Sequence, residues 1–167
     1  MKKNKFYLLA MMLMAMLCIG FVSCDKEDLQ EEEVTNSSGD EEITGEGLAG
    51  TWRFVIVENY YKNGKSDRID YTQYSSYYKQ YCQFDGNGKG ILYEWEQGNG
   101  WYVDPFSYTY DGTYIIGLDE DGGKIEVLKL TSTELVLKIS EYLDDETVEY
   151  MVQTYKRVKD SAVKDAK

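Results

Sequence analysis

The chain has 167 residues, a formal net charge of −12 and no histidine. The acidic balance argues against nucleic acid or anionic lipid as a partner, because both bind clustered lysine and arginine. The absence of histidine excludes His-based catalytic triads and zinc–His sites, and it removes the usual general base at neutral pH.

Residues 1–23 have the layout of a secretory signal peptide. Three lysines, Lys2, Lys3 and Lys5, precede an apolar run over residues 6–22. This run is shorter than the ~20 residues that a membrane-spanning helix needs, so a retained transmembrane anchor is the alternative. Removing the segment deletes three lysines and no acidic residue, which leaves a net charge of −15.

A cysteine follows the apolar run directly. The sequence Phe21-Val22-Ser23-Cys24 resembles the lipobox of bacterial lipoproteins, which implies that Cys24 carries acyl chains such as palmitate and becomes the mature N-terminus. Several acyl chains, at ~0.8 kcal/mol per buried CH₂, make a firm membrane anchor. The alternative is a chance cysteine beside an ordinary cleavage site.

The residues after Cys24 bear on the cellular address. Asp25 to Asp28 resemble the short lysine-plus-acidic surface-export signal that follows the lipidated cysteine in one phylum of Gram-negative bacteria. The resemblance implies a surface-exposed, lipid-anchored protein of the Gram-negative outer membrane. An aspartate directly after the cysteine marks inner-membrane retention in other Gram-negative groups, and that alternative stays open.

Residues 24–47 are predicted to be a disordered tether. Residues 25–47 hold ten acidic residues, one lysine and almost no large apolar residue, and a segment with so little to bury does not fold by itself. The polar tail, residues 159–167, is expected to be disordered as well.

Residues 48–158 form the one predicted domain, and their apolar residues alternate with a period of two. Such alternation indicates half-buried strands, and glycine-containing turns such as "DGNGKG" (85–90) and "YDGT" (110–113) separate them. Eight strands are expected, at roughly 50–60, 77–84, 89–96, 103–110, 113–118, 123–130, 134–142 and 146–157. An antiparallel meander of this size hides its edges by closing, so we predict an all-β, eight-stranded barrel.

The domain resembles the small lipocalin-like lipoproteins of gut-dwelling Gram-negative bacteria. "LAGTWRF" (48–54) opens it with a Gly-x-Trp, and "QFDGNGKG", "YTYDGTYII", "KIEVLKLTSTELVLKI" and "YMVQTYKRV" follow in order. The resemblance implies that Trp52 closes the bottom of the barrel and that Arg157 or Lys156 packs across it. It also implies that the long link between the first two strands lids the open end.

That link is rich in tyrosine, a residue with a flat apolar face and a hydrogen-bonding tip that suits sugars and protein surfaces. Strand formation and core filling are the alternative role for these rings. The candidate ligand-binding residues are Tyr60, Tyr61, Tyr71, Tyr74, Tyr77, Tyr78, Trp95 and Trp101.

The remaining chemistry points away from catalysis. Cys82 is expected to be buried and inert, and Glu94 with Glu96 is expected to lie on a solvated strand face, with a glycosidase-like carboxylate pair as the alternative. No calcium site is predicted, because "DGNG" and "DEDGG" lack the acidic series of a calcium loop. No catalytic residue, other metal site or cofactor is predicted either.

The predicted function is therefore a non-enzymatic, monomeric, lipid-anchored barrel. It binds a small apolar molecule, a glycan or a peptide at a tyrosine-rich mouth. The alternative is an accessory subunit or inhibitor that binds another protein in an outer-membrane surface complex.

Overall fold

The computed structural model describes residues 47–118, 122–140, 143 and 147–166. The predicted signal peptide, Cys24 and all but the last residue of the predicted tether lie outside the described residues. Within the described part, no helix is long and apolar enough to cross a membrane.

The described residues form an all-β domain with one antiparallel sheet. Its ten strands are β1 (Gly50–Tyr61), β2 (Ser66–Asp70), β3 (Tyr78–Phe84), β4 (Lys89–Glu96), β5 (Gly100–Ser107), β6 (Thr109–Tyr110), β7 (Tyr114–Ile116), β8 (Lys124–Leu130), β9 (Glu134–Ile139) and β10 (Val148–Val158). Two short 3₁₀ helices accompany them, η2 (Tyr71–Tyr74) and η3 (Asp160–Ala166). The strand order is β5-β4-β3-β1-β10-β9-β8-β7-β6, and β2 pairs with β1 beside this path.

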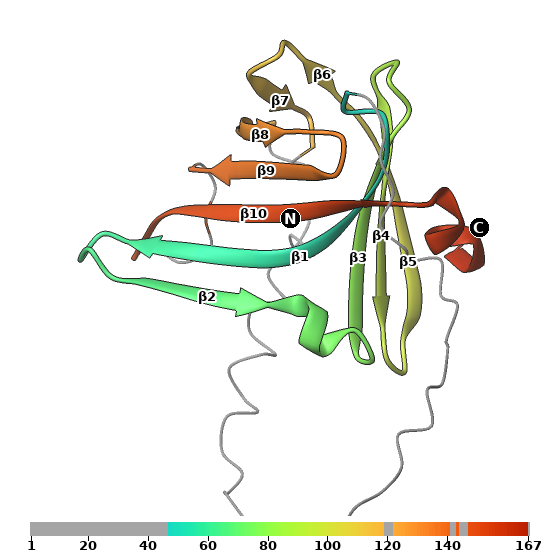
Figure 1. The fold of residues 1–167 in the computed structure, drawn as a ribbon, viewed down its shortest axis with the longest axis horizontal. Coiled ribbons are helices and arrows are strands. Elements are labelled where there is room, and N and C mark those ends of the chain that lie inside the picture. Colours follow the sequence, from blue (N-terminus) through green and yellow to red (C-terminus); the bar gives the residue numbers. More distant parts are fainter. Residues whose placement is uncertain (1–46, 119–121, 141–142, 144–146, 167) are drawn as a thin grey trace, which may run out of the picture. The chain divides into compact units, whose positions relative to one another are not determined.

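The sheet nearly closes into a barrel. The two ends of the strand order, β5 and β6, are consecutive in sequence, with Tyr108 alone between them. One segment of chain thus pairs with β4 on one side and with β7 on the other. Figure 1 shows β1 and β10 side by side, with β3, β4 and β5 crossing them. Closure protects the sheet edges that an open meander would expose.

The predicted antiparallel barrel is confirmed, but the strand count is ten rather than eight. Each of the eight predicted segments contains strand residues. The segment 103–110 starts earlier, at Gly100, and is interrupted at Tyr108, so it forms both β5 and β6. The additional strand, β2, lies in the tyrosine-rich link that the sequence predicts as a loop.

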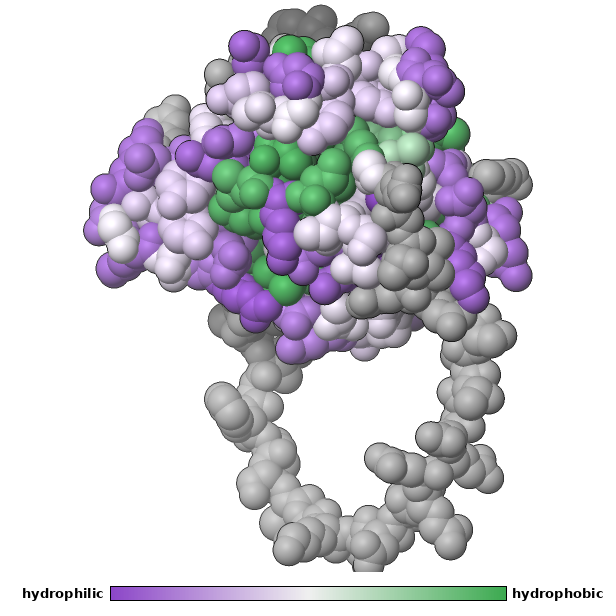
Figure 2. Space-filling view, turned by 45° about the horizontal axis from the view of Figure 1, so that its top comes forward, coloured by the Kyte–Doolittle hydropathy of each residue, from purple (hydrophilic) through white to green (hydrophobic). Residues whose placement is uncertain are grey.

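The barrel interior is apolar and largely aromatic. It contains the inward side chains Leu48, Trp52, Phe54, Val57, Cys82, Phe84, Tyr108, Ile115, Ile125, Leu135, Leu137 and Tyr155. A bulge at Val55 shifts the pairing of β1 with β10, so that Val57 rather than Ile56 continues the inward set. Some apolar surface stays accessible: Figure 2 shows apolar residues gathered in the middle of one face, with polar residues around them.

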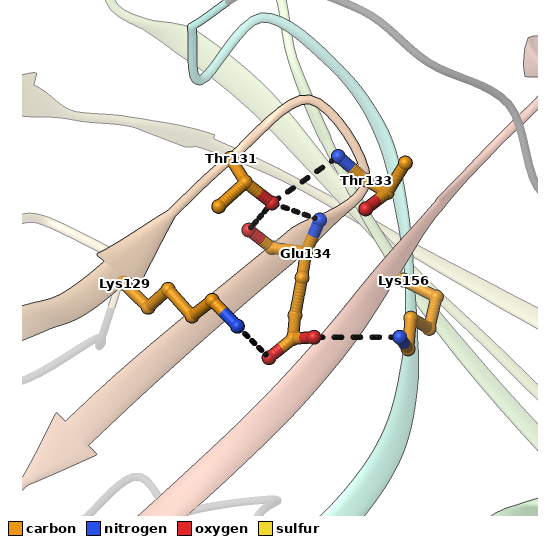
Figure 3. Close-up of polar contacts among 5 residues, drawn as sticks. All are labelled: Lys129, Thr131, Thr133, Glu134 and Lys156. Atoms are coloured by element: carbon orange, nitrogen blue, oxygen red, sulfur yellow. Dashed lines mark hydrogen bonds and ion pairs between the residues drawn. The ribbon is translucent and has the colours of Figure 1, made fainter.

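Side-chain hydrogen bonds hold the hairpin turns. In the β8–β9 turn, Thr131 Oγ1 accepts from the backbone N–H groups of Thr133 and Glu134, at 3.3 and 3.0 Å. The Glu134 carboxylate pairs with Lys129 at 3.1 Å and with Lys156 at 3.4 Å (Figure 3). This carboxylate therefore ties β8 and β10 to the start of β9.

The C-terminal segment is ordered, so the prediction of a disordered tail is wrong for residues 160–166. Helix η3 packs on the outer face of the barrel, where Val163, which is 0% exposed, joins a second apolar cluster with Tyr81, Tyr93 and Val158. Asp160 also accepts a hydrogen bond from Thr51 Oγ1 at 2.6 Å. The sequence suggested disorder because a short polar segment with one valine shows no periodicity, yet the outer face offers it an apolar surface.

Candidate functional site

One end of the barrel, here called the base, is closed by Trp52 and Arg157. The Arg157 guanidinium lies over the indole ring, with Cζ 4.0 Å from the ring centroid. Its Nε donates to Ser132 O at 3.0 Å, and its two terminal nitrogens donate to the carbonyls of Ala49 and Gly47. Trp52 Nε1 donates to Leu48 O at 2.8 Å.

These contacts place Trp52 and Arg157 as the lipocalin resemblance implied. The other candidate for the second role, Lys156, points to Glu134 instead. Both Trp52, at 0% exposed, and Arg157, at 3%, are inaccessible. The base is therefore a sealed structural end, and a ligand site must be sought elsewhere.

The opposite end, here called the η2 end, is where β3 leaves β1. The two strands pair only from Gly50 with Phe84 to Arg53 with Tyr81. Beyond that point β1 pairs with β2, and the start of β3 pairs with β4 alone. Helix η2 joins β2 to β3 at this separation (Figure 1). Side chains and a four-residue helix, rather than a continuous backbone ladder, close this part of the wall.

A single aspartate starts η2. Asp70 Oδ1 accepts from Thr72 N at 3.0 Å and from Thr72 Oγ1 at 2.6 Å. These bonds stabilise the charged carboxylate and lower the pKa of Asp70. This N-cap is an ordinary Asx arrangement, and it orients the first residue of the helix, Tyr71, towards the interior.

Aromatic rings converge at the η2 end. The Tyr71 ring lies 4.8 Å from Phe54 and 5.7 Å from Tyr78, measured between ring centroids. Phe54 in turn lies 5.4 Å from Tyr155. Farther out, Tyr74 contacts Tyr71 at 6.2 Å and is 42% exposed. The rings thus run from solvent into the barrel interior.

Glu94 on β4 lies beside these rings. Its Oε1 accepts from Tyr78 Oη at 3.4 Å and from Gln80 Nε2 at 3.1 Å. Burial raises the pKa of Glu94, the Tyr78 bond opposes that rise, and the neighbouring Asp104 and Glu96 add to it. The interior of this end therefore carries a partly buried carboxylate held by neutral donors.

The position of Glu94 shows that the sequence-based assignment of the two faces of β4 is wrong. The alternation places Glu94 with Glu96 on a solvated face, opposite Ile91, Tyr93 and Trp95. The structure shows both faces of β4 covered: Tyr93 lies under η3, and Glu94 is partly buried and hydrogen-bonded to inward-facing Tyr78. Alternation reveals two faces but cannot say which of two covered faces is the interior.

The predicted site residues are only partly brought together. Tyr71, Tyr78 and Tyr74 share the η2 end, and Tyr77, in the segment between η2 and β3, is 59% exposed. Trp101 packs against Tyr81 in the cluster under η3, away from the interior. Trp95 pairs with Trp101 across β4 and β5 and so shares that outer face.

Tyr60 and Tyr61 lie at the far end of β1. Tyr60 stacks on Tyr150 at 4.5 Å with the rings 15° from parallel, and Tyr61 Oη donates to Asp67 at 2.8 Å. Sequence reasoning missed Phe54, Gln80, Glu94 and Tyr155 as members of the η2 end. Their shared position depends on the register between strands far apart in the sequence.

The site offers no array of metal ligands. Among the described residues, no three His, Cys, Asp or Glu side chains are grouped so as to hold a metal ion. Cys82 is buried in the interior, and burial raises its pKa well above the ordinary value, so the thiol is protonated at neutral pH.

No known protein family and no curated protein sequence matches the chain. Among solved structures, the chain is similar to a lipocalin-like protein from Bacteroides uniformis ATCC 8492, with a TM-score of 0.44 and 18% identity over 66% of this chain and 97% of that one. It is also similar to the siderocalin Ex-FABP, described as functioning through dual ligand specificities, with a TM-score of 0.39 and 13% identity over 70% and 75% of the two chains. The assignment of the fold itself rests on the strand order and register given above.

Proposed function

We propose that this protein is a lipid-anchored, non-enzymatic protein of the cell envelope whose barrel binds a small molecule at the η2 end. The lipobox-like sequence at Cys24 supports the anchor. The sealed base and the aromatic η2 end support the choice of site. Such a protein holds a ligand close to the membrane surface without transforming it.

The convergence of Phe54, Tyr71 and Tyr78 carries the proposal. Ligand sites are apolar and aromatic, with a few polar groups that fix orientation. Here three rings surround the point where the β1–β3 ladder stops, and Glu94 with Gln80 supplies the polar groups.

Helix η2 gives a ligand a way in. It has four residues and no buried side chain, and the Asp70 cap stabilises its first turn. A helix of this length opens at little cost in free energy. A ligand that displaces the Tyr71 ring gains the contacts with Phe54 and Tyr78 that this ring makes in the free protein.

A ligand array tests the site. Lipids, glycans and peptides are titrated into the protein while its intrinsic fluorescence or its melting temperature is followed. A saturable response is expected. Tyr71→Ala is expected to strengthen it, because the ligand no longer has to displace the ring from Phe54 and Tyr78, and Tyr60→Ala is expected to leave it unchanged. The control is matched, because Tyr60 is also a partly buried, stacked tyrosine, but it lies at the far end of β1. The absence of a saturable response across all classes would refute a small-molecule site.

The anchor has a separate test. Cys24→Ala is expected to abolish palmitate labelling and to release the protein from the membrane fraction. A variant that stays membrane-bound and still incorporates palmitate would show that the lipobox interpretation is wrong. This outcome would not contradict the proposed ligand site.

The exposure of Tyr74 and Tyr77 favours one second candidate function. Exposed tyrosines are enriched at protein interfaces, and at 42% and 59% exposed these two lie next to each other in space, with Tyr77 N donating to Tyr74 O at 2.8 Å. The protein would then act as an accessory subunit or inhibitor in a surface complex. Crosslinking in intact membranes that captures the same partner with the natural chain, and loses it with Tyr77→Ala, would support this function.

A further inference from the structure

Glu94 is the only acidic side chain of the described residues that is hydrogen-bonded to one of the converging rings at the η2 end. We propose that the ligand taken there is an organic cation, with an amine that pairs with Glu94 and an apolar or aromatic body that packs against the tyrosine rings. This inference rests on the proposed function and names the chemical class of its ligand.

The groups that face Glu94 are neutral or negative. They come from four strands, and they are Tyr78 and Gln80 on β3, Glu96 on β4, Asp104 and Tyr102 on β5, and Tyr155 on β10. None of these carries a positive charge, and an anionic ligand would be repelled by Glu94 and by the more distant carboxylates of Asp104 and Glu96. An uncharged apolar ligand would fit the rings but would leave Glu94 without a cation.

The aromatic rings favour the same charge. The face of a tyrosine or phenylalanine ring is negative, and it attracts a cation placed within about 6 Å of its centre. Tyr71 lies 4.8 Å from Phe54 and 5.7 Å from Tyr78 between ring centroids, so a group that takes the place of the Tyr71 ring contacts both of the others. Carboxylate and rings are independent features, and both select positive charge.

The ionised form of Glu94 is destabilised in the ligand-free protein. Burial and the nearby Asp104 and Glu96 raise its pKa, so the ionised form is less stable here than in water. A carboxamide would accept the Tyr78 hydrogen bond without this cost. Bound positive charge would offset the cost, which explains how a partly buried carboxylate with neutral donors can be useful.

A metal ion fits the site less well than an organic cation. The described residues do not bring three His, Cys, Asp or Glu side chains together, and calcium or zinc requires such a set. A single carboxylate with aromatic walls instead resembles the chemistry by which proteins hold ammonium groups. The amine is thus expected to be part of a molecule with its own apolar surface.

Three probes with one shared ring system test the charge class. Tryptamine is a cation, 3-ethylindole is neutral and indole-3-propionate is an anion at neutral pH. Their binding to the full chain is measured by isothermal titration calorimetry and by ligand-observed NMR, which avoid overlap with the protein's own tryptophan fluorescence. Tryptamine is expected to bind about tenfold or more tightly than 3-ethylindole, the usual gain from one charge-assisted hydrogen bond, and indole-3-propionate is expected to bind least.

A matched pair of variants locates the effect. Glu94→Gln is expected to lower tryptamine affinity to that of 3-ethylindole without changing 3-ethylindole binding. Glu58→Gln is the control, because Glu58 is a partly buried carboxylate on the outer face that pairs with Arg68 at 3.7 Å. It is expected to leave the preference for the cation unchanged. Lowering the pH through the raised pKa of Glu94 is expected to weaken tryptamine alone, which tests the charge without a mutation.

The outcomes separate this inference from the proposed function. Equal binding of the three probes, or a preference for the cation that survives Glu94→Gln, would overturn the cation class and leave the η2 end as a binding site. If no probe of any charge binds at millimolar concentration, and Tyr71→Ala changes no ligand response in the array, both the class and the site are wrong.

Discussion

Replacing Arg157 by alanine is expected to remove a large part of the stability of the barrel. This residue is 3% exposed, and it donates to three carbonyls, those of Gly47, Ala49 and Ser132. Its guanidinium also covers the ring of Trp52 at 4.0 Å. The side chain therefore joins the chain before β1, the β8–β9 turn and the last strand.

The magnitude follows from what Arg157→Ala leaves behind. An unpaired buried acceptor costs ~1–3 kcal/mol, with carbonyls in turns at the lower end because water can reach them. The lost cation–π contact adds ~1 kcal/mol. We expect the free energy of unfolding to fall by ~3–5 kcal/mol, which is a large part of the ~5–15 kcal/mol of a typical domain.

Urea unfolding followed by tryptophan fluorescence measures this change. Lys156→Ala is the control, since Lys156 is the neighbouring cation and makes a partly exposed ion pair with Glu134 at 3.4 Å, worth less than ~1 kcal/mol. Arg157→Lys is expected to fall between the two, because it keeps the charge but loses the planar fork. If Arg157→Ala costs no more than Lys156→Ala, the base is not held in the way described.

Four further predictions follow. Val163→Asp is expected to lower the free energy of unfolding in urea by ~3 kcal/mol, because it places a charge in the cluster under η3, where Val163 is 0% exposed. If its effect equals that of Ser161→Asp within error, η3 does not dock on the outer face of the barrel. Gly117→Ala is expected to lower the free energy of unfolding by ~2–3 kcal/mol in thermal unfolding, because Gly117 has φ 94° and an added Cβ would lie 2.2 Å from Ser107 O. Gly112→Ala is the control that isolates backbone strain, because Gly112 has φ 96° but open space around it. With Cys18 and Cys24 replaced by serine, Cys82 is expected to react with a thiol reagent only on unfolding, since burial raises its pKa, and fast labelling of the folded protein would contradict this. Glu94→Gln is expected to raise the melting temperature at pH 7, because folding raises the pKa of Glu94 and its ionised form therefore destabilises the folded protein. This destabilisation is absent below the ordinary carboxyl pKa and grows as the pH rises through the raised value. Equal melting temperatures of the two proteins at pH 7 would show that the charge costs nothing.

The sequence alone predicted most of the strands, because alternation and turn chemistry are local. Asp85 and Asp111 start tight turns by accepting backbone N–H bonds, and the glycines beside them, Gly86 and Gly112, have positive φ angles. Such signals require no knowledge of distant residues. The lipocalin resemblance similarly implied the pairing of Trp52 with Arg157, which joins the two ends of the domain.

Several features of the site could not be predicted in this way. Strand β2 was missed because its sequence, SDRID, is polar, and it pairs only because β1 offers a free edge once β3 leaves. Helix η3 was missed because its order comes from the outer face of β3 and β4, to which Tyr81 and Tyr93 contribute. Trp95 and Trp101 were assigned to the mouth, although their strand register places them on the outer face.

The all-β class and the positions of the turns follow from the sequence, because a period of two and glycine-rich turns restrict the backbone locally. Which face of each strand is the interior depends on how the strands pack in three dimensions. β4 has both faces covered, so its alternation is the same whether Tyr93 or Glu94 points inward. Closure of the sheet through β5 and β6, and the docking of η3 on the outside, place Glu94 among the rings of the η2 end.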